Sequence, residues 1–518
     1  MRRQPGETPD QRPGALRLTW VQPEDLIGHE LRQAAEDGRD ASAVERRWRT
    51  AGGHPAPDRS GASPRPADPG LRALAGRLLD ELADLPSPSA DDEPTDLPAI
   101  RAACPDWPST PAPAPASVTT AGARSASTHP TAAPPDSLRP RLEAAWLGRA
   151  AGCLLGKPVE KLPLAGIRAL ARGTGNWPLR TWFTEAGLDP AIAARYSWNT
   201  HSRATSLAEN IDGMPEDDDL DHPVLGLLLL QRHGHGFRTT DVARLWLDEL
   251  PAGRTFTAER VAYRNLLDGI EPPHTASYRN PFREWIGALI RADVFGWTRP
   301  GDPAAAAAAA WRDATLTHTA NGVYGEMFAA AAIAEAAGGH TDVHGCLRAG
   351  LAVVPRQSRL ARAVRFGIET AQDEPTGSDA GFADVVDRLH RALGHHHWVH
   401  VLPNAALLAA ALTHADGAFS GSVCRVVSGG WDTDSNGATA GSIAGLLAGS
   451  PHALPSRWTE PLHNRLTTTV SDLNGIGFDT LATRTAALAV SRTSGLRTTD
   501  SRTSDTRATG RPPRDTGP

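Results

Sequence analysis

Apolar residues recur at intervals of three or four through most of the 518-residue chain. Between residues 138 and 490, long Ala- and Leu-rich segments are separated by short breaks of Gly, Pro and Asp. Alternating runs of β-branched and aromatic residues, which would indicate strands, are almost absent. We therefore predict an all-α core. The segments with the clearest helical spacing are residues 142–155, 223–231, 239–250, 285–291, 304–312, 322–337, 358–373, 405–415 and 439–447.

The same pattern divides the chain into four parts. Residues 15–85 carry apolar positions at helical spacing, which predicts an N-terminal helical extension. Residues 86–137 are rich in Pro, Ala, Ser and Thr and hold too few apolar groups to offset chain entropy, so we expect a flexible linker. Residues 138–490 form the expected main helical domain, and residues 491–518 the expected disordered tail.

Composition excludes several classes of partner. The formal net charge is −6, and no basic stripe interleaved with aromatic residues is present, so we expect no nucleic-acid partner. The four Cys have no CxxC spacing and are expected to be buried small hydrophobes. The polar N-terminus lacks the apolar core of a signal peptide and no apolar run reaches the length of a membrane span. We therefore expect a cytoplasmic monomer with no membrane partner.

Four consecutive acids, Glu216, Asp217, Asp218 and Asp219, stand shortly before the apolar run 224–230. One or two acids in a first helical turn would interact well with the helix dipole and its free amide groups. Four adjacent acids repel one another when they are partly buried, unless a cation compensates their charge. Oxygen ligands favour Mg²⁺, Mn²⁺ or Ca²⁺ over zinc. Taken alone, the segment is equally typical of a solvated acidic loop.

A second acidic segment changes that balance. Asp432 and Asp434 lie in a glycine-flanked loop, Ser435 adds a hydroxyl, and a helix of small residues follows. Gly441 and Gly445 are one turn apart, which would allow this helix to pack closely against a neighbour and bury its N-terminal loop. An Asx-rich turn that caps the helix is the alternative for this segment. That alternative does not explain why the chain carries a second loop as acidic as the first.

Three stretches, 148–160, 216–219 and 430–435, together resemble the ADP-ribosylglycohydrolase family, all-α dimetal hydrolases that remove ADP-ribose from side chains and related compounds. The first is similar to the family's opening helix and glycine turn, which ends in an acid at Glu160. The others stand where the family has Thr-Asp-Asp-Thr and Asp-Thr-Asp-Thr. A fourth stretch, 317–325, is similar to a segment that lines the ribose pocket. The resemblance covers roughly residues 142–490.

The resemblance implies a compact multi-helix orthogonal bundle and a site with two Mg²⁺ ions, Mn²⁺ being possible. The implied metal ligands are Glu216, Asp217, Asp218, Asp432, Asp434 and Ser435. The implied catalytic residues are Glu160, Asp217 and Asp434, and the implied substrate-binding residues are His318, Gly287 and Arg291. Without the resemblance, Glu160 would be taken as a surface acid paired with Lys157 or Lys161, and His318 as a core histidine.

Several positions depart from the family pattern. Glu216 and Asp219 replace threonines, Ser435 replaces a threonine, Trp431 is inserted before the Asp pair, and Cys153 takes a position that is often acidic. Residues 286–291 look like a glycine-rich substrate loop without its asparagine. The residues 395–400, which include four histidines, are expected to be a polar junction before a helix.

The leading hypothesis is a metal-dependent hydrolase that cleaves the glycosidic bond of ADP-ribose attached to a protein side chain or a small molecule. Cleavage at C1 of a ribose develops oxocarbenium character, for which carboxylates and an activated water are suited. A related glycosidase with another ribosyl or nucleotide substrate is the first alternative. A catalytically silent member that binds ADP-ribose or acts structurally is the second.

Overall fold

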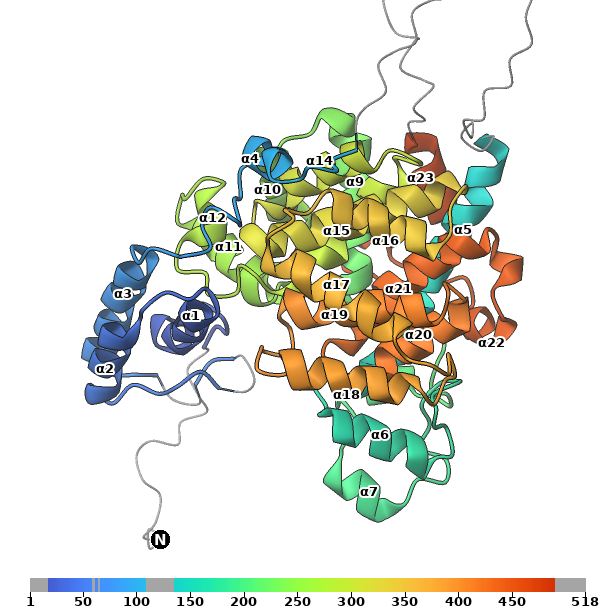
Figure 1. Ribbon diagram of the computed structural model, residues 1–518, viewed down its shortest axis with the longest axis horizontal. Helices are drawn as coiled ribbons and strands as arrows, with labels where there is room; N and C mark the ends of the chain where they lie inside the picture. The colour runs from blue at the N-terminus through green and yellow to red at the C-terminus, as the bar shows by residue number, and fades with distance from the viewer. Residues whose placement is uncertain (1–16, 58–60, 64–65, 109–134, 490–518) are drawn as a thin grey trace, which may run out of the picture.

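The computed structural model describes residues 17–57, 61–63, 66–108 and 135–489 (Figure 1). All regular elements in these ranges are α-helices or short 3-10 helices, and the β-type pairing there is confined to isolated bridges. The prediction of an all-α fold is confirmed. None of the helices in these ranges combines the length and the apolar character that crossing a membrane requires.

Three almost completely buried helices form the centre of the bundle: α15 (Ala320–Gly338), α19 (Val401–His414) and α21 (Thr433–Ala448). Their sequences are rich in Ala and Gly, and small side chains allow helix axes to approach closely. Around them, α5 (Pro135–Gly156) packs along α21, α17 (Arg359–Gln372) packs along α19, and α14 (Pro303–Ala314) and α16 (Val343–Ala352) pack along α15.

The other helices complete the shell. The α-helices are α6 (Leu164–Gly173), α7 (Pro190–Arg195), α8 (Arg203–Ser206), α9 (Asp218–His233), α10 (Thr239–Glu249), α11 (Thr257–Leu267), α12 (His274–Ser277), α13 (Asp293–Trp297), α18 (Phe382–Leu393), α20 (Phe419–Ser428), α22 (Ser456–Thr459) and α23 (Phe478–Leu488). The 3-10 helices are η1 (Lys157–Val159), η2 (Gly234–Gly236), η3 (Ala252–Arg254), η4 (Ile286–Arg291), η5 (Pro451–Ala453), η6 (Glu460–Leu462) and η7 (Ser471–Leu473).

Glycines bring α5 and α21 into backbone contact. A Cβ atom on Gly148 would lie 2.2 Å from the carbonyl oxygen of Gly441, and one on Gly152 would lie 1.9 Å from that of Gly437. Such distances exclude any side chain at these positions. The contact places the C-terminal end of α5 beside the N-terminal end of α21, where a Cβ on Gly156 would lie 2.3 Å from Thr433.

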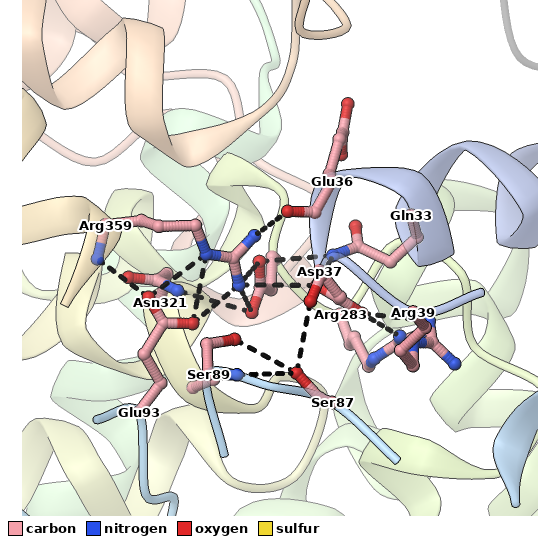
Figure 2. A network of polar contacts seen from close by, with 12 residues as sticks. Gln33, Glu36, Asp37, Arg39, Ser87, Ser89, Glu93, Arg283, Asn321 and Arg359 are labelled. Atoms are coloured by element: carbon pink, nitrogen blue, oxygen red, sulfur yellow. Dashed lines mark hydrogen bonds and ion pairs between the residues drawn. The ribbon is translucent and has the colours of Figure 1, made fainter. Parts of the chain in front are cut away.

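The N-terminal extension contains α1 (Pro23–Glu36), α2 (Ser42–Thr50) and α3 (Pro69–Ala83), as its apolar spacing predicts. These helices lie at one side of the bundle (Figure 1). Figure 2 shows the polar contacts that join them to it. Asp37 forms ion pairs with Arg283 at 3.0 Å and Arg359 at 3.3 Å, and Arg359 also contacts Glu93 at 2.7 Å.

The structure describes residues 86–108, the first part of the expected linker. This segment contains α4 (Leu97–Ala102) and packs against the bundle. Trp311 Nε1 donates to the Thr95 carbonyl at 2.8 Å, and Tyr324 donates to that of Pro94. The contacts come from side chains more than 200 residues away, which composition alone cannot reveal. Residues 109–134 of the expected linker and the expected tail at 491–518 lie outside the described residues.

Several predicted helices begin earlier and one forms differently. The helices expected from residues 142, 405 and 439 begin at Pro135, Val401 and Thr433. The helix expected at 223–231 begins five residues earlier, as α9, because Pro223 is accommodated within it. The segment 285–291 forms the 3-10 helix η4 in place of an α-helix. It is a short connection that leads directly into α13, and short connections of this kind frequently adopt 3-10 geometry.

Candidate active site

The first acidic segment forms the N-terminus of α9. Asp217 is the N-cap, and its Oδ1 accepts the Asp219 amide at 2.9 Å. The predicted helix-capping role is therefore real for Asp217. The positive end of the helix dipole also faces this cluster of carboxylates.

Lys157 provides a fixed positive charge beside Asp217. It lies in η1, directly after α5, and is buried. Its Nζ contacts Asp217 Oδ2 and lies 3.3 Å from the carbonyl oxygen of Glu216. Although burial disfavours the charge, the Lys157 ammonium holds the pKa of Asp217 below its usual value. Asp217 is thus an ionised carboxylate.

Asp219 lies on the other side of Asp217, close to Cys153 and Arg149. Its Oδ2 is 3.7 Å from the Cys153 sulfur, and its Oδ1 is 3.5 Å from Arg149 Nη2. Arg149 Nε also donates to the Asp219 backbone carbonyl at 2.7 Å. This carbonyl has no helical partner because Pro223, four residues later, lacks an N–H group. Arg149 thereby fixes the first turn of α9.

The second acidic segment forms the N-terminus of α21. Gly430 and Trp431 both have positive φ, +80° and +56°, which turns the chain sharply before Asp432. The Trp431 ring stacks on His390 with centroids 3.9 Å apart and an interplanar angle of 3°. Asn404 from α19 accepts the Asp432 amide at 3.0 Å. The loop is held from both sides and directs Asp432 and Asp434 into the site.

The structure brings Glu160, Asp432 and Asp434 together. One carboxylate oxygen from each lies within 4.8 Å of the other two. Glu160 follows η1, where its side chain contacts Lys161 at 2.7 Å and Asn199 at 2.7 Å. The surface pair with Lys161 that the bare sequence suggested is present, and the same carboxylate also faces the Asp432–Asp434 pair.

Electrostatics joins the two acidic segments into one site. Burial raises the pKa of Asp218 well above its usual value, and the charges of Asp217, Asp219, Asp434 and Glu160 raise it further. Burial and Glu160 likewise raise the pKa of Asp434 to about 7, and burial and Asp434 raise that of Asp432. The carboxylates therefore lack sufficient positive charge around them. An all-oxygen donor set with this deficit fits a hard divalent cation such as Mg²⁺ or Mn²⁺.

The remaining predicted ligands lie at the edge of this arrangement. Glu216 is half-buried and pairs with the exposed Arg254 at 3.0 Å. Burial and the nearby Asp221 raise its pKa. Ser435 is buried in the first turn of α21, and its amide donates to Asp434 Oδ1 at 3.2 Å. Ser435 thus lies beside the acidic pair, whereas Glu216 points toward a surface arginine.

The predicted substrate-binding residues are placed differently. Arg291 is 2% exposed, and its guanidinium contacts Asp313, Glu259 and Thr317. His318 is fully buried, with Nδ1 2.6 Å from Thr317 Oγ1. A Cβ on Gly287 would lie 2.1 Å from Glu259 Oε1. Interior ion pairs hold the Arg291 guanidinium, and Gly287 packs against Glu259. The partners lie far away in sequence, so the motif alone could not show this.

Three residues of the site were missed by sequence reasoning. Lys157 was considered only as a partner of Glu160, Arg149 was treated only as part of the helix motif, and Asn404 was not singled out. A lysine or arginine on the helix that precedes an acidic cluster was the available signal for the first two. Asn404 joins the site through tertiary packing, and nothing in its local sequence indicates this.

Comparisons with known proteins found one matching family model and a solved structure similar to this chain. The family model described as ADP-ribosylglycohydrolase matches residues 134–491. None of the curated proteins matches the chain. A solved structure named "ADP-ribosylglycohydrolase-related protein complex" matches with 20% sequence identity and a TM-score of 0.43, over 68% of this chain and 100% of that chain. Because the family model spans well over half of the sequence, this chain belongs to the ADP-ribosylglycohydrolase family.

Proposed function

We propose that this chain is a metal-dependent hydrolase that cleaves the glycosidic bond of ADP-ribose attached to a protein side chain or a small molecule. One observation carries the proposal: Glu160, from the turn after α5, lies with Asp432 and Asp434 at the N-terminus of α21. A carboxyl group beside an oxygen-rich cation site is the arrangement that hydrolysis at a ribose C1 requires. Family membership supports the same reaction class.

In this proposal Asp432, Asp434 and Ser435 hold a divalent cation, Mg²⁺ or Mn²⁺, with Asp218 and Glu216 as further oxygen donors. When bound, the cation orients ribose hydroxyls and acidifies water. Magnesium and manganese are preferred over zinc because all of the donors are oxygens.

Glu160 is the proposed general acid and base. Lys161 and Asn199 hold its two carboxylate oxygens, each at 2.7 Å, so its orientation is fixed before substrate arrives. As a carboxylate paired with Lys161, it can take a proton from the attacking water and pass that proton to the leaving group. Asp217 stays ionised because the Lys157 ammonium contacts its carboxylate, and the pair carries no net charge.

The test is release of ADP-ribose from proteins ADP-ribosylated on arginine or serine and from small ADP-ribosyl compounds. Released ADP-ribose is quantified by chromatography in Mg²⁺, in Mn²⁺ and in chelator. We expect release that needs a divalent cation and is lost in the Asp432→Ala, Asp434→Ala double variant. If no substrate yields ADP-ribose in either metal, the proposed activity is wrong.

A second candidate is a glycosidase for a different ribosyl or nucleotide substrate. It is favoured by the burial of Arg291 and by the packing of Gly287 against Glu259, since η4 then offers no free arginine for a diphosphate. Nucleosides and nucleotides without a second ribose separate the candidates. Faster release of base or phosphoribose from these compounds than of ADP-ribose would support the second.

A further inference from the structure

Lys157 is a cation built into the proposed metal site. Its side chain is 10% exposed, and its Nζ contacts both Asp217 Oδ2 and the Glu216 carbonyl oxygen. The lysine follows Gly156, whose close contact with Thr433 fixes the end of α5. The ammonium group therefore enters the site from the backbone junction that also positions the second acidic segment.

The Lys157 ammonium contacts one carboxylate oxygen of Asp217. The second carboxylate oxygen of Asp217 accepts the Asp219 amide at 2.9 Å, so donors of the protein contact both oxygens. A divalent ion that bound either oxygen would lie next to the Lys157 Nζ. The two like charges would repel each other strongly inside a buried site.

Asp219 lies beside a second cation, Arg149, which it shares with Asp293; the Arg149–Asp293 ion pair measures 2.6 Å. The Arg149 guanidinium lies 3.5 Å from the Asp219 carboxylate and donates a hydrogen bond to the Asp219 carbonyl oxygen at 2.7 Å. The Cys153 sulfur lies 3.7 Å from the Asp219 carboxylate. The group formed by Cys153, Asp217 and Asp219 is therefore supplied with positive charge from lysine and arginine.

The opposite side of the site differs. Asp434 Oδ1 accepts the backbone amide of Ser435 at 3.2 Å. Lys161 on this side forms an ion pair with Glu160 at 2.7 Å, and its side chain is 43% exposed. Glu160, Asp432 and Asp434 still present three carboxylate oxygens to one another within 4.8 Å. Lys161 and Asn199 contact both oxygens of Glu160, so the carboxylates left to bind a divalent cation here are those of Asp432 and Asp434.

We propose that the Lys157 ammonium takes the place of one of the two divalent cations that the family resemblance implies. The site then binds a single divalent ion, at Asp432 and Asp434 beside Glu160, while Lys157 holds Asp217. The inference rests on the proposed function for the presence of metal, and it changes the number of ions and their position.

Manganese titration tests the inference without measuring activity. Bound Mn²⁺ is counted on the full chain by equilibrium dialysis, and its spectrum is recorded by electron paramagnetic resonance. We expect one ion per chain and the signal of an isolated Mn²⁺. In Lys157→Met, which keeps the aliphatic stem and removes the charge, we expect two ions. Two ions about 3.5–4 Å apart would couple their spins and broaden the signal.

Arg254→Met is the matched control. It removes a cation that pairs with Glu216 at the surface and leaves Asp217 unchanged, so it is expected to bind one ion. Two ions in the wild type, one ion in a folded Lys157→Met, or two in Arg254→Met would each overturn the inference. If circular dichroism shows that Lys157→Met does not fold, the number of Mn²⁺ ions bound to the wild-type chain still tests the inference.

Different results would contradict the proposed function and the single-ion inference. Cation-dependent release of ADP-ribose together with two coupled Mn²⁺ ions in the wild type overturns the inference and leaves the proposed function standing. The absence of both bound Mn²⁺ and ADP-ribose release overturns both.

Discussion

A carboxylate that the family often carries on its first helix stands on a different helix in this chain. Cys153 occupies the position that is often acidic, and Asp219 occupies one where the family has threonine. The structure places the two side chains in contact, with 3.7 Å between the sulfur and Oδ2. At this point in space the chain has one acid, and α9 carries it instead of α5.

This exchange predicts an energetic coupling between the two positions. Cys153→Asp alone would place a second carboxylate beside Asp219 and lower the melting temperature, because two buried like charges repel. Asp219→Thr alone would remove a counter-charge of Arg149 and also destabilise. The double variant restores one acid and is expected to be more stable than the two single changes predict, by about 0.5–3 kcal/mol. A melting temperature equal to the sum of the single effects would contradict this compensation.

Glu160→Gln tests the role of the carboxyl group separately from the fold. The amide keeps the size of the side chain and can still contact Asn199, but it cannot exchange a proton. We expect the rate of ADP-ribose release to fall by about 10²- to 10⁴-fold, the usual contribution of general acid–base catalysis. The affinity for Mn²⁺ is measured alongside. A rate within a few-fold of wild type would assign Glu160 to cation binding only.

At the scale of elements, the site is a meeting of helix ends. The first acidic segment begins α9, the second begins α21, and the turn with Glu160 ends α5. The helix N-termini direct free amide groups and positive dipoles at the acids. The separation of these ends depends on the backbone contact between α5 and α21, which only glycine permits.

Gly152→Ala is therefore expected to disturb the site from a distance. The added Cβ would lie 1.9 Å from the Gly437 carbonyl, so the helices must separate. We expect a loss of about 1–3 kcal/mol in stability, typical of an overpacked core, and weaker Mn²⁺ binding. Gly236→Ala is the control, since its Cβ meets nothing within 4 Å. Wild-type stability and Mn²⁺ affinity in Gly152→Ala would show that the helix contact does not set the site.

The sequence predicted the helices and the acidic motifs, but it did not predict the contacts between distant elements. Helical spacing predicted the all-α fold, and the acidic motifs identified Asp432 and Asp434, because short segments encode both features. The environment of Arg291 could not be predicted, since Asp313 and Glu259 approach it from separate helices. Likewise, the Lys157–Asp217 contact joins residues 60 positions apart. Tertiary packing determines such partners, and local pattern does not contain them.

At the scale of the whole molecule, the N-terminal extension is joined to the bundle by buried charges. Arg283 and Arg359 of the bundle face Asp37 of the extension. Beside them, Glu36 lies 3.4 Å from both His396 Nδ1 and His400 Nε2, and in Figure 2 its carboxylate turns away from the arginines. The segment 395–400, which was expected to be a polar junction, is thus a contact surface for α1. The residue that contacts it, Glu36, lies 360 positions before His396 in the sequence.

Glu284 within this interface gives the docking a pH dependence. Burial is the main cause that raises its pKa from 4.5 to about 7; Arg359 opposes this rise, and the charges of Asp37 and Glu93 add to it. A raised folded-state pKa contributes stability that is complete below about pH 4.5 and is lost as pH rises through about 7. Glu284→Gln resembles the protonated form of Glu284, so it does not lose this stability as pH rises. We expect equal melting temperatures at pH 5 and a variant more stable by about 1–3 kcal/mol at pH 8, measured calorimetrically in chelator. A difference independent of pH would show that Glu284 stays ionised throughout, held by Arg359.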